Sequence, residues 1–422
     1  MSIQAKAARR RRQRIAAITR HHTTSPGRGQ FETVHHRPHH NRGVNETSYP
    51  AARIVAATVY AHFAQRLEEA AARGETELAV LPDEAAIATM IDAAFWASLR
   101  REEGYVPKIS LAFLGPAQTP FPMMLERPLS LDPGALTKVA PAVERAGIHL
   151  AVSGRGHDLS VWGTAEAVPR YCCIIEVAQP GLLVVKHHRG DEAAKFINVA
   201  VLQGDQIKAI DEHANTLPDC PDLISSLVGF DSPASWTTST NLLVQLAVSM
   251  RAHGRGGTLV VVPPATAAWH DSVVHPISYA VSPAFAELSL LVRERPSEDQ
   301  QRGWQEALAR AIGHVAGLTA VDGAVVLNAD YELLAFGAKI TRRRGSALVE
   351  QVTVTEPIRG AEAMVVNPSA LGGTRHLSAA QFVHDQRDAT ALVASQDGRF
   401  TVFAWSPCEN MVHAHRVESL LL

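Results

Sequence analysis

The fold of the C-terminal region is indicated by the stretch Asp322-Gly323-Ala324-Val325-Val326-Leu327, in which an acidic residue and a glycine precede an apolar run. Further along the chain, Gly373-Thr374-Arg375-His376 stands directly before a helix-like segment, Ser378–Gln386. An aspartate at the start of a strand can hold a metal ion, and a turn that caps a helix can hold phosphate. The two motifs together predict a site that handles a nucleotide.

The segments around these motifs predict a mixed β-sheet with flanking helices. Val321–Leu327 and Leu333–Phe336 flank the turn sequence Asn328-Ala329-Asp330, which predicts a hairpin. A second hairpin is predicted for Thr390–Ala394 and Phe400–Trp405. The fold class expected for the C-terminal region is therefore α/β, of the mixed α+β kind.

The region before residue 295 predicts a separate, strand-rich α+β domain. Helical periodicity predicts helices over 51–73, 83–99 and 136–146, and Pro141 can split the last of these. Turns rich in Gly, Pro or Asp separate seven predicted strands: Ile109–Phe113, Ile148–Val152, Leu159–Trp162, Ile174–Val177, Leu182–Lys186, Ile197–Val201 and Gln206–Ile210.

The glycines of Gly254-Arg255-Gly256-Gly257 follow a predicted helix, Thr238–His253, and precede a predicted strand, Thr258–Val262. Phosphate loops have the opposite order, strand then helix, so that a helix N-terminus faces the anion. We therefore interpret these glycines as a helix end and a tight turn. A further helix is predicted for Trp304–Val315, after a polar break at residues 296–299.

The 422 residues allow two or three domains, and we expect boundaries that give 1–48, 49–295 and 299–422. Residues 1–48 carry ten Lys/Arg, two Asp/Glu and six His, which predicts a disordered basic tail. We interpret the tail as a solvated segment; contact with nucleic acid or metal is the alternative.

The four cysteines form no C-x-x-C pair, which favours a reducing cytoplasm. No apolar run approaches the ~18 residues that span a bilayer, so no membrane partner is expected.

Residues 299–422 resemble the diadenylate cyclase domain, the nucleotide-binding fold of the DNA-integrity scanning proteins. That family carries Asp-Gly-Ala at a strand start, Gly-Thr-Arg-His-Arg before a helix, and a later hairpin with a serine and following acidic residues. The matching residues are Asp322-Gly323-Ala324, Gly373-Thr374-Arg375-His376, and Ser395 with Asp397, in the same order.

The resemblance implies a homodimer or higher oligomer in which two facing domains each hold one ATP. The 3′-hydroxyl of each nucleotide attacks the α-phosphate of the other, which yields cyclic di-AMP and pyrophosphate, with Mg²⁺ or Mn²⁺ as cofactor. Asp322, Arg375 and His376 are then the expected catalytic residues, and Asp322 and Asp397 the expected metal ligands. The expected nucleotide contacts are Gly323, Ala324, Gly373, Thr374, Arg375, His376 and Ser395.

The chemistry of these residue types agrees with that role. A carboxylate such as Asp322 ligates hard cations, and Gly323 allows a close approach of the backbone to a nucleotide. The Thr374 hydroxyl and the Arg375 guanidinium can bind phosphate oxygens, and His376 can donate to a phosphate or polarise the leaving group.

Residues 49–295 resemble the sensor region, called DACNV, that precedes diadenylate cyclase domains in some bacterial signalling and defence proteins. The stretch Phe95-Trp96-Ala97-Ser98-Leu99-Arg100-Arg101-Glu102-Glu103-Gly104 and the glycine-rich turn before Thr258 carry this resemblance. It implies that this region senses an unknown ligand and passes the signal to the cyclase domain.

Leu377 departs from the diadenylate cyclase pattern, because the family has a second arginine at this position. The acidic pair after Ser395 is likewise reduced to Gln396-Asp397. The basic run Arg342-Arg343-Arg344 either compensates for the lost charge or is a solvated strand end. The sequence therefore leaves two interpretations, a sensor-coupled diadenylate cyclase and a domain that binds a nucleotide without turnover. A nucleic-acid-binding regulator that uses the basic tail is a third, and nucleic acid is the least favoured partner.

Overall fold

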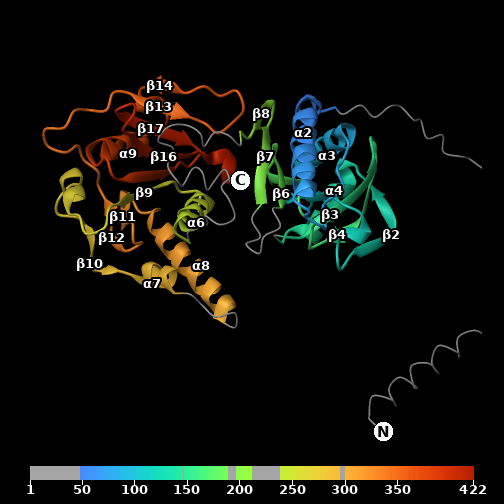
Figure 1. Cartoon of the computed structure of the whole chain (residues 1–422), viewed down its shortest axis with the longest axis horizontal. Helices are drawn as coiled ribbons and strands as arrows, with labels where there is room; N and C mark the ends of the chain where they lie inside the picture. Colours follow the sequence, from blue (N-terminus) through green and yellow to red (C-terminus); the bar gives the residue numbers. More distant parts are fainter. Residues whose placement is uncertain (1–47, 146, 189–195, 212–237, 295–299) are drawn as a thin grey trace, which may run out of the picture. The chain divides into compact units, whose positions relative to one another are not determined.

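The computed structural model describes residues 48–145, 147–188, 196–211, 238–294 and 300–422 (Figure 1). The predicted basic tail lies outside these residues, apart from Ser48, as does Cys220. Two β-sheets organise the described part of the chain, one in the N-terminal and one in the C-terminal half. This architecture confirms the predicted mixed α/β fold class.

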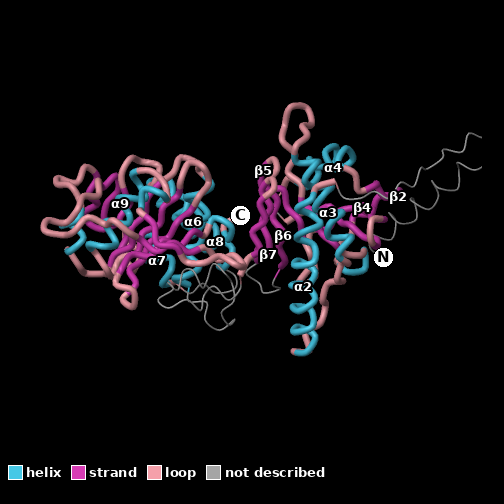
Figure 2. Tube along the Cα trace, turned by 90° about the horizontal axis from the view of Figure 1, so that it is seen from above, coloured by secondary structure: helices cyan, strands magenta, loops and turns pink. Residues whose placement is uncertain are grey.

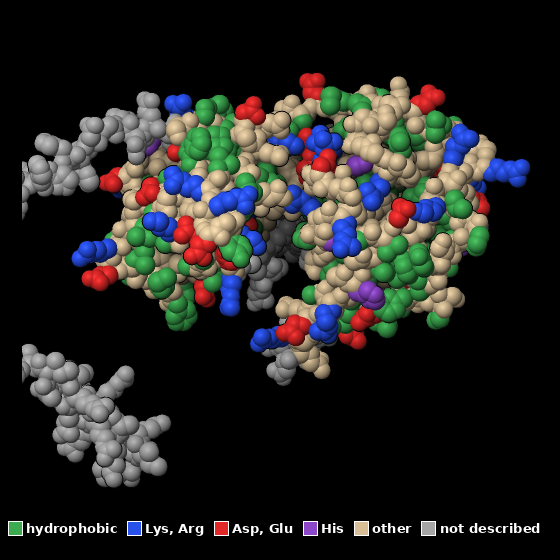
Figure 3. Space-filling view, turned by 180° about the vertical axis from the view of Figure 1, so that it is seen from behind, with side chains coloured by type: hydrophobic (Ala, Val, Ile, Leu, Met, Phe, Trp, Pro, Cys, Tyr) green, Lys and Arg blue, Asp and Glu red, His purple; other side chains and the backbone are tan. Residues whose placement is uncertain are grey.

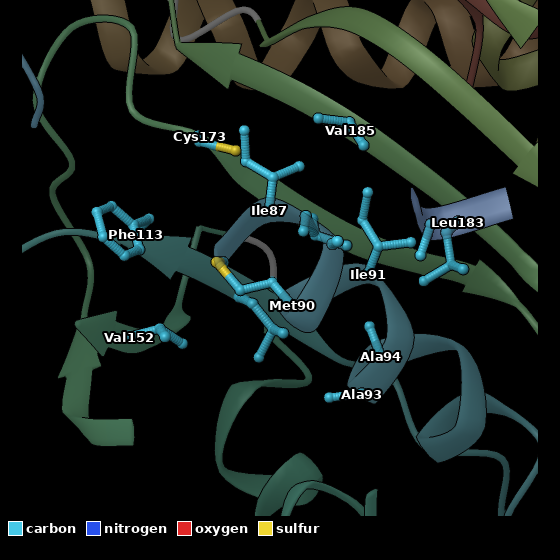
Figure 4. Close-up of a cluster of buried hydrophobic side chains, with 14 of the residues drawn as sticks. Ile87, Met90, Ile91, Ala93, Ala94, Phe113, Val152, Cys173, Leu183 and Val185 are labelled. Carbon is cyan, nitrogen blue, oxygen red and sulfur yellow. The ribbon is translucent and has the colours of Figure 1, made fainter. Parts of the chain in front are cut away.

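Helices α2 (Pro50–Ala72) and α3 (Glu84–Ser98) cover one face of the first sheet. The Asp83 carboxylate caps α3 by accepting a hydrogen bond from the Ala86 backbone N–H at 2.8 Å. Figure 4 shows Ile91 of this helix beside Leu183 of the sheet, within the core of this domain. A shorter helix, α4 (Pro133–Val139), and a 3₁₀ turn, Ala140–Val143, replace the single predicted helix, since Pro141 ends the α-helical pattern.

The first sheet has eight strands in the order β2-β4-β3-β1-β5-β6-β7-β8. Figure 2 shows strands β5 to β7 beside α2. All seven predicted strands are present, and β2 is an additional edge strand. The bounds are β1 Ser110–Phe113, β2 Met123–Ser130, β3 His149–Arg155, β4 Asp158–Ala165, β5 Ile174–Gln179, β6 Leu182–His188, β7 Phe196–Gln203 and β8 Gln206–Ala209.

The second sheet has nine strands in the order β10-β12-β11-β9-β15-β16-β17-β13-β14. Both predicted hairpins are confirmed, as the antiparallel pairs β11–β12 and β15–β16. The bounds are β9 Gly257–Val262, β10 Tyr279–Phe285, β11 Ala324–Asn328, β12 Leu333–Ala338, β13 Val352–Thr355, β14 Met364–Val366, β15 Thr390–Ala394, β16 Phe400–Ser406 and β17 Met411–Arg416.

Helices cover both faces of this second sheet, which makes three layers (Figure 1). Leu259 of β9 packs in the core formed with α6 (Thr238–Ala252), α7 (Glu287–Arg293) and α8 (Gln301–Leu318). Its neighbour Val260 points the other way and packs with α9 (Thr374–Asp385). Successive strand residues face opposite layers, so the apolar run of β9 is buried on both sides.

The predicted domain boundary near residues 295–299 is corrected by this topology. β9 and β10 precede residue 295, yet β9 pairs in parallel with β11 and antiparallel with β15, near the centre of the second sheet. The C-terminal domain therefore includes α6, which begins at Thr238. The polar break was misleading because it separates two helices of one domain rather than two domains.

The described helices include none that is long and apolar enough to cross a membrane. Acidic and basic side chains are interspersed over the face of the molecule shown in Figure 3. Cys172 and Cys173 are buried free thiols, and burial raises the pKa of the Cys173 thiol to about 12.

Candidate functional site

The topology of the second sheet brings several chain ends to one edge. β9 and β11 run parallel, with Thr258 opposite Ala324, so both strands begin at this edge. β12 is antiparallel to β11 and β15 is antiparallel to β9, so they end there, at Ala338 and Ala394. Residues that precede β11 or follow β12 and β15 therefore lie close together.

A cavity of about 520 Å³ opens at this edge. Small-molecule sites typically occupy roughly 300–1,000 Å³. The cavity is lined by eight of the nine site residues expected from the sequence: Asp322, Gly323, Ala324, Gly373, Thr374, Arg375, His376 and Ser395. The structure thus brings together three motifs that lie far apart in the sequence.

Asp322 lies at the mouth of this cavity, with 92% of its side chain exposed. Its carboxylate forms an ion pair with the ammonium group of Lys339. The hydrogen bond from Lys339 and the charge of that residue lower the pKa of Asp322. Asp322 is therefore an ionised, solvent-accessible carboxylate that can bind a cation.

Lys339 is a site residue that the sequence analysis missed. It follows β12 and lines the cavity together with Asp322 and Arg375. The signal that could have found it is the register of the predicted hairpin, because Ala338 pairs with Ala324. That pairing places the residue after β12 beside the residues that precede β11.

The Gly-Thr-Arg-His motif forms the first turn of α9, which begins at Thr374 rather than at Ser378 as predicted. Gly373 is the N-cap residue, and its side of the helix opens on the cavity. The free backbone N–H groups of a first turn carry partial positive charge and favour anions. The first turn of α9, which includes Thr374 and Arg375, therefore favours the binding of an anion such as a phosphate group.

Gly256 supports Arg375 from the turn between α6 and β9. Its φ is +70°, and a Cβ atom at this position would lie 3.1 Å from the Arg375 guanidinium and 3.2 Å from the Ala394 carbonyl oxygen. The structure confirms that these glycines form a helix end and turn, since α6 ends at Ala252. The turn also makes room for a residue of the site.

His376 is buried, with 2% of its surface exposed, although its ring borders the cavity. Its Nε2 lies 3.5 Å from the Thr401 hydroxyl, and burial lowers the pKa of the imidazole. The ring is therefore neutral near pH 7. A neutral imidazole can donate one hydrogen bond to a phosphate or a leaving group.

The structure requires a glycine at position 323. Its φ is +122°, and a Cβ atom would lie 2.4 Å from the carbonyl carbon of Gly337. Only glycine fits where β11 and β12 approach so closely. This requirement exists whether or not a nucleotide contacts Gly323.

Asp397 is the predicted site residue that does not line this cavity, although its carboxylate is hydrogen-bonded to Ser395, which does. It lies in the turn after β15 and lines a different cavity. Burial would raise the pKa of Asp397, but hydrogen bonds from Ser395 and the Arg399 backbone N–H lower it. The predicted pairing of Asp397 with Asp322 as metal ligands is therefore not supported by their placement.

The structure also shows where Leu377 and the basic run 342–344 lie. Leu377 is 41% exposed and does not line the 520 Å³ cavity. Arg343 and Arg344 line another cavity, of about 660 Å³, at the C-terminal end of α9. Arg343 and Arg344 of the basic run are consequently separate from the 520 Å³ cavity.

A comparison with protein families finds one match in the N-terminal half. Residues 76–166 match a family described as "Probable sensor domain DACNV". The matched residues contain α3 and strands β1 to β4, together with the predicted sensor motif at 95–104. The match supports a sensor domain of this kind and does not extend to the second sheet. No curated protein matches the chain.

Proposed function

We propose that residues 238–422 form a nucleotide-binding domain of the diadenylate cyclase type, controlled by the sensor domain that precedes it. The observation that carries this proposal is the convergence of Asp322-Gly323-Ala324, Gly373-Thr374-Arg375-His376 and Ser395 on one cavity. These are the residues that the family resemblance assigns to ATP, and they come from three separate segments.

The proposed reaction joins two ATP molecules, one from each of two facing domains. Each ribose 3′-oxygen bonds to the α-phosphorus of the other nucleotide, and each bond from the α-phosphorus to pyrophosphate breaks. Positioning and electrostatic stabilisation provide most of the catalysis in such transfers. Arg375 binds phosphate oxygens, the first turn of α9 supplies backbone donors, and His376 donates a hydrogen bond to the developing charge.

The cavity fits a divalent cation that arrives with the nucleotide. Asp322 is the only carboxylate among its described lining residues, and the described residues contain no cluster of His, Cys, Asp or Glu that could hold a metal alone. Mg²⁺ is commonly held by one or two carboxylates together with substrate phosphates. Asp322 is thus the residue that would hold Mg²⁺ or Mn²⁺, which neutralises phosphate charge when bound.

The first domain is proposed to read a ligand whose identity is unknown. The DACNV match at residues 76–166 supports a sensing role for this domain. Because each domain holds one nucleotide and the reaction needs two, a homodimer or higher oligomer with facing cyclase domains is the proposed active form. The sensor can then act by changing how often two sites face each other.

The test is incubation of the purified full-length chain with ATP and Mn²⁺, followed by chromatography and mass spectrometry of the products. We expect cyclic di-AMP and pyrophosphate in a ratio of one to two. ATP hydrolysis to ADP, or unchanged ATP at every protein concentration, would contradict the proposed activity. A rate per chain that rises with protein concentration would indicate the facing dimer.

A second candidate function is nucleotide binding without turnover, which the placement of Leu377 favours. The side chain at this position is apolar and half exposed, outside the cavity, so this domain lacks one charged contact of the family. Calorimetry would then show ATP binding while no product forms. A gain of product formation in Leu377→Arg would identify the domain as a cyclase that has lost activity.

A further inference from the structure

Two basic side chains, Lys339 and Arg375, are present among the described residues that line the 520 Å³ cavity. A nucleoside triphosphate is a polyanion, and charge-assisted hydrogen bonds are the strong contacts in phosphate sites. Arg375 is expected from the family pattern, whereas Lys339 belongs to no motif of the sequence. The ammonium group of Lys339 is paired with the Asp322 carboxylate.

We propose that Lys339 is the second phosphate-binding residue of this site and exchanges partners when a nucleotide binds. In the free protein its ammonium group neutralises Asp322. In the complex it binds the phosphates, and the Asp322 carboxylate becomes available to the divalent cation that accompanies them. This inference rests on the proposed nucleotide-binding function and adds the residue that offsets Leu377.

The surroundings of Lys339 fix its backbone and leave its side chain movable. The Val274 backbone N–H donates to the Lys339 carbonyl oxygen at 2.8 Å, and the Thr341 N–H donates to the Ser272 carbonyl oxygen at 3.0 Å. The side chain itself is 52% exposed. A lysine has a flexible four-carbon stem and a rotatable ammonium group, so it can change partners without movement of the chain.

The ion pair between Lys339 and Asp322 can be exchanged at little cost. Both side chains are exposed, and ion pairs of this kind typically contribute only about 0.2–1 kcal/mol. A polyphosphate offers the ammonium group more negative charge than one carboxylate does. Arg343 and Arg344 are not placed to bind phosphates in the 520 Å³ cavity, because they line the other cavity.

The experiment measures binding of α,β-methylene-ATP to the full-length chain by calorimetry, in EDTA and in Mn²⁺. Lys339→Met should weaken binding about ten- to a hundredfold, the effect of losing one charge-assisted contact. Lys339→Arg should stay within about threefold of the wild type, since it keeps the charge. Arg344→Met, a matched cation of the other cavity, should bind like the wild type.

The exchange of partners by Lys339 should change the nucleotide affinity that is measured in EDTA, without metal. Asp322→Asn releases Lys339 from its carboxylate, so nucleotide binding without metal should become about two- to fivefold tighter. The same substitution in a Lys339→Met background should give no gain. Weaker or unchanged binding by Asp322→Asn in EDTA, or a gain that persists without Lys339, would overturn the exchange.

The outcomes separate this inference from the proposed function. If Lys339→Met is folded by circular dichroism and binds the analogue like the wild type, Lys339 is not the phosphate contact, while the nucleotide-binding proposal stands. If the wild-type chain binds no analogue in either condition, both proposals fail. Retained binding by Lys339→Arg guards against a simple folding defect in the methionine variant.

Discussion

Asp322 is an exposed, charged residue at the cavity, so a substitution there should change activity without changing the stability of the fold. Its side chain is 92% exposed and contacts Lys339. Asp322→Ala should therefore leave the melting temperature nearly unchanged while it removes the carboxylate that is proposed to bind the cation. Product formation should fall at least a hundredfold, the scale of losing one electrostatic contact in a transition state.

The measurement for this prediction is cyclic di-AMP formation beside a thermal unfolding curve. Asp330→Ala is the matched control, because Asp330 is also an exposed aspartate next to a strand of this sheet, with an ion pair to Arg293 at 3.9 Å. Turnover in Asp322→Ala equal to that of the control would remove Asp322 from the mechanism.

Gly256 offers a second prediction, on the position of Arg375. Gly256→Ala places a methyl group 3.1 Å from the Arg375 guanidinium and puts alanine at a φ of +70°. The backbone strain should cost roughly 1–2 kcal/mol, and the contact should displace Arg375 and weaken nucleotide binding. Gly254→Ala isolates the contact, since Gly254 has a φ of +66° with no atom within 4 Å of its Cβ. Equal nucleotide affinities in the two variants would show that Arg375 does not depend on Gly256.

These residues also show how far the sequence could predict the site. Asp322 and the Gly-Thr-Arg-His motif stand out because their residue types carry the chemistry. Lys339 does not, since a single lysine after a strand is common and only the hairpin register places it beside Asp322. Asp397 lines another cavity, because proximity to Ser395 in the sequence does not determine which cavity its side chain borders.

At the level of elements, the loop between β12 and β13 is held against α9 by one buried carboxylate. The side chain of Asp385 is fully buried and accepts hydrogen bonds from the Arg343 N–H at 2.7 Å and the Gln381 amide at 2.9 Å, and from Ser346 at 2.5 Å. His384 Nδ1 lies 3.2 Å away. These bonds join the loop to the C-terminal end of the helix whose first turn forms the site.

Asp385→Asn should destabilise the protein by roughly 2–4 kcal/mol, because it removes a buried charge from its donors and turns an amide N–H toward them. Urea unfolding followed by circular dichroism measures this change. Asp388→Asn is the control, since Asp388 is exposed just beyond the same helix. Equal unfolding midpoints for the two variants would contradict the anchoring role of Asp385.

Two of the strands that the sequence did not predict are β2 and β17. β2 is an edge strand that is mostly exposed, so it shows no buried face. β17 carries the buried residues His413 and His415, whose ring nitrogens lie 2.8 Å from Glu409 and 2.7 Å from Thr355 respectively. The pair of His415 with Thr355 joins strands far apart in the sequence, so no local pattern reveals it.

At the scale of the whole molecule, the position of β9 determines where the chain can be cut to give a C-terminal domain that folds by itself. β9 lies between β11 and β15 and hydrogen-bonds with both, although β11 begins at Ala324, far along the chain. Such a parallel pairing of distant segments cannot be read from local periodicity. The match at residues 76–166 and the separate first sheet agree with a sensor domain that ends before α6.

A fragment of residues 238–422 should therefore fold, whereas a fragment of residues 299–422 should not. The shorter fragment lacks β9, so the facing edges of β11 and β15 would have no partner and the apolar residues around them would be exposed. Cooperative thermal unfolding and dispersed amide resonances would identify the folded fragment. A well-folded 299–422 fragment would show that the sheet tolerates the loss of its central strand.

The dependence of stability on pH follows from buried histidines in both domains. Burial is the main cause that lowers the pKa of His62 to about 3, and those of His149 and His415 to about 4. In the unfolded chain these groups take up protons near pH 6.5. Between that pH and their folded pKa values, the unfolded state binds more protons than the folded state, so acidification favours unfolding.

Stability should therefore fall as the pH is lowered from 7 to 4.5, by up to about 1.4 kcal/mol per pH unit for each histidine. Carboxylates with lowered pKa values, such as Asp132, lose their contribution only at lower pH, below their unfolded values near 4. The two windows are thus separate, and urea unfolding at pH 7, 6, 5 and 4.5 isolates the histidine contribution. A free energy of unfolding that stays constant over this range would mean that the three imidazoles gain protons without loss of the fold.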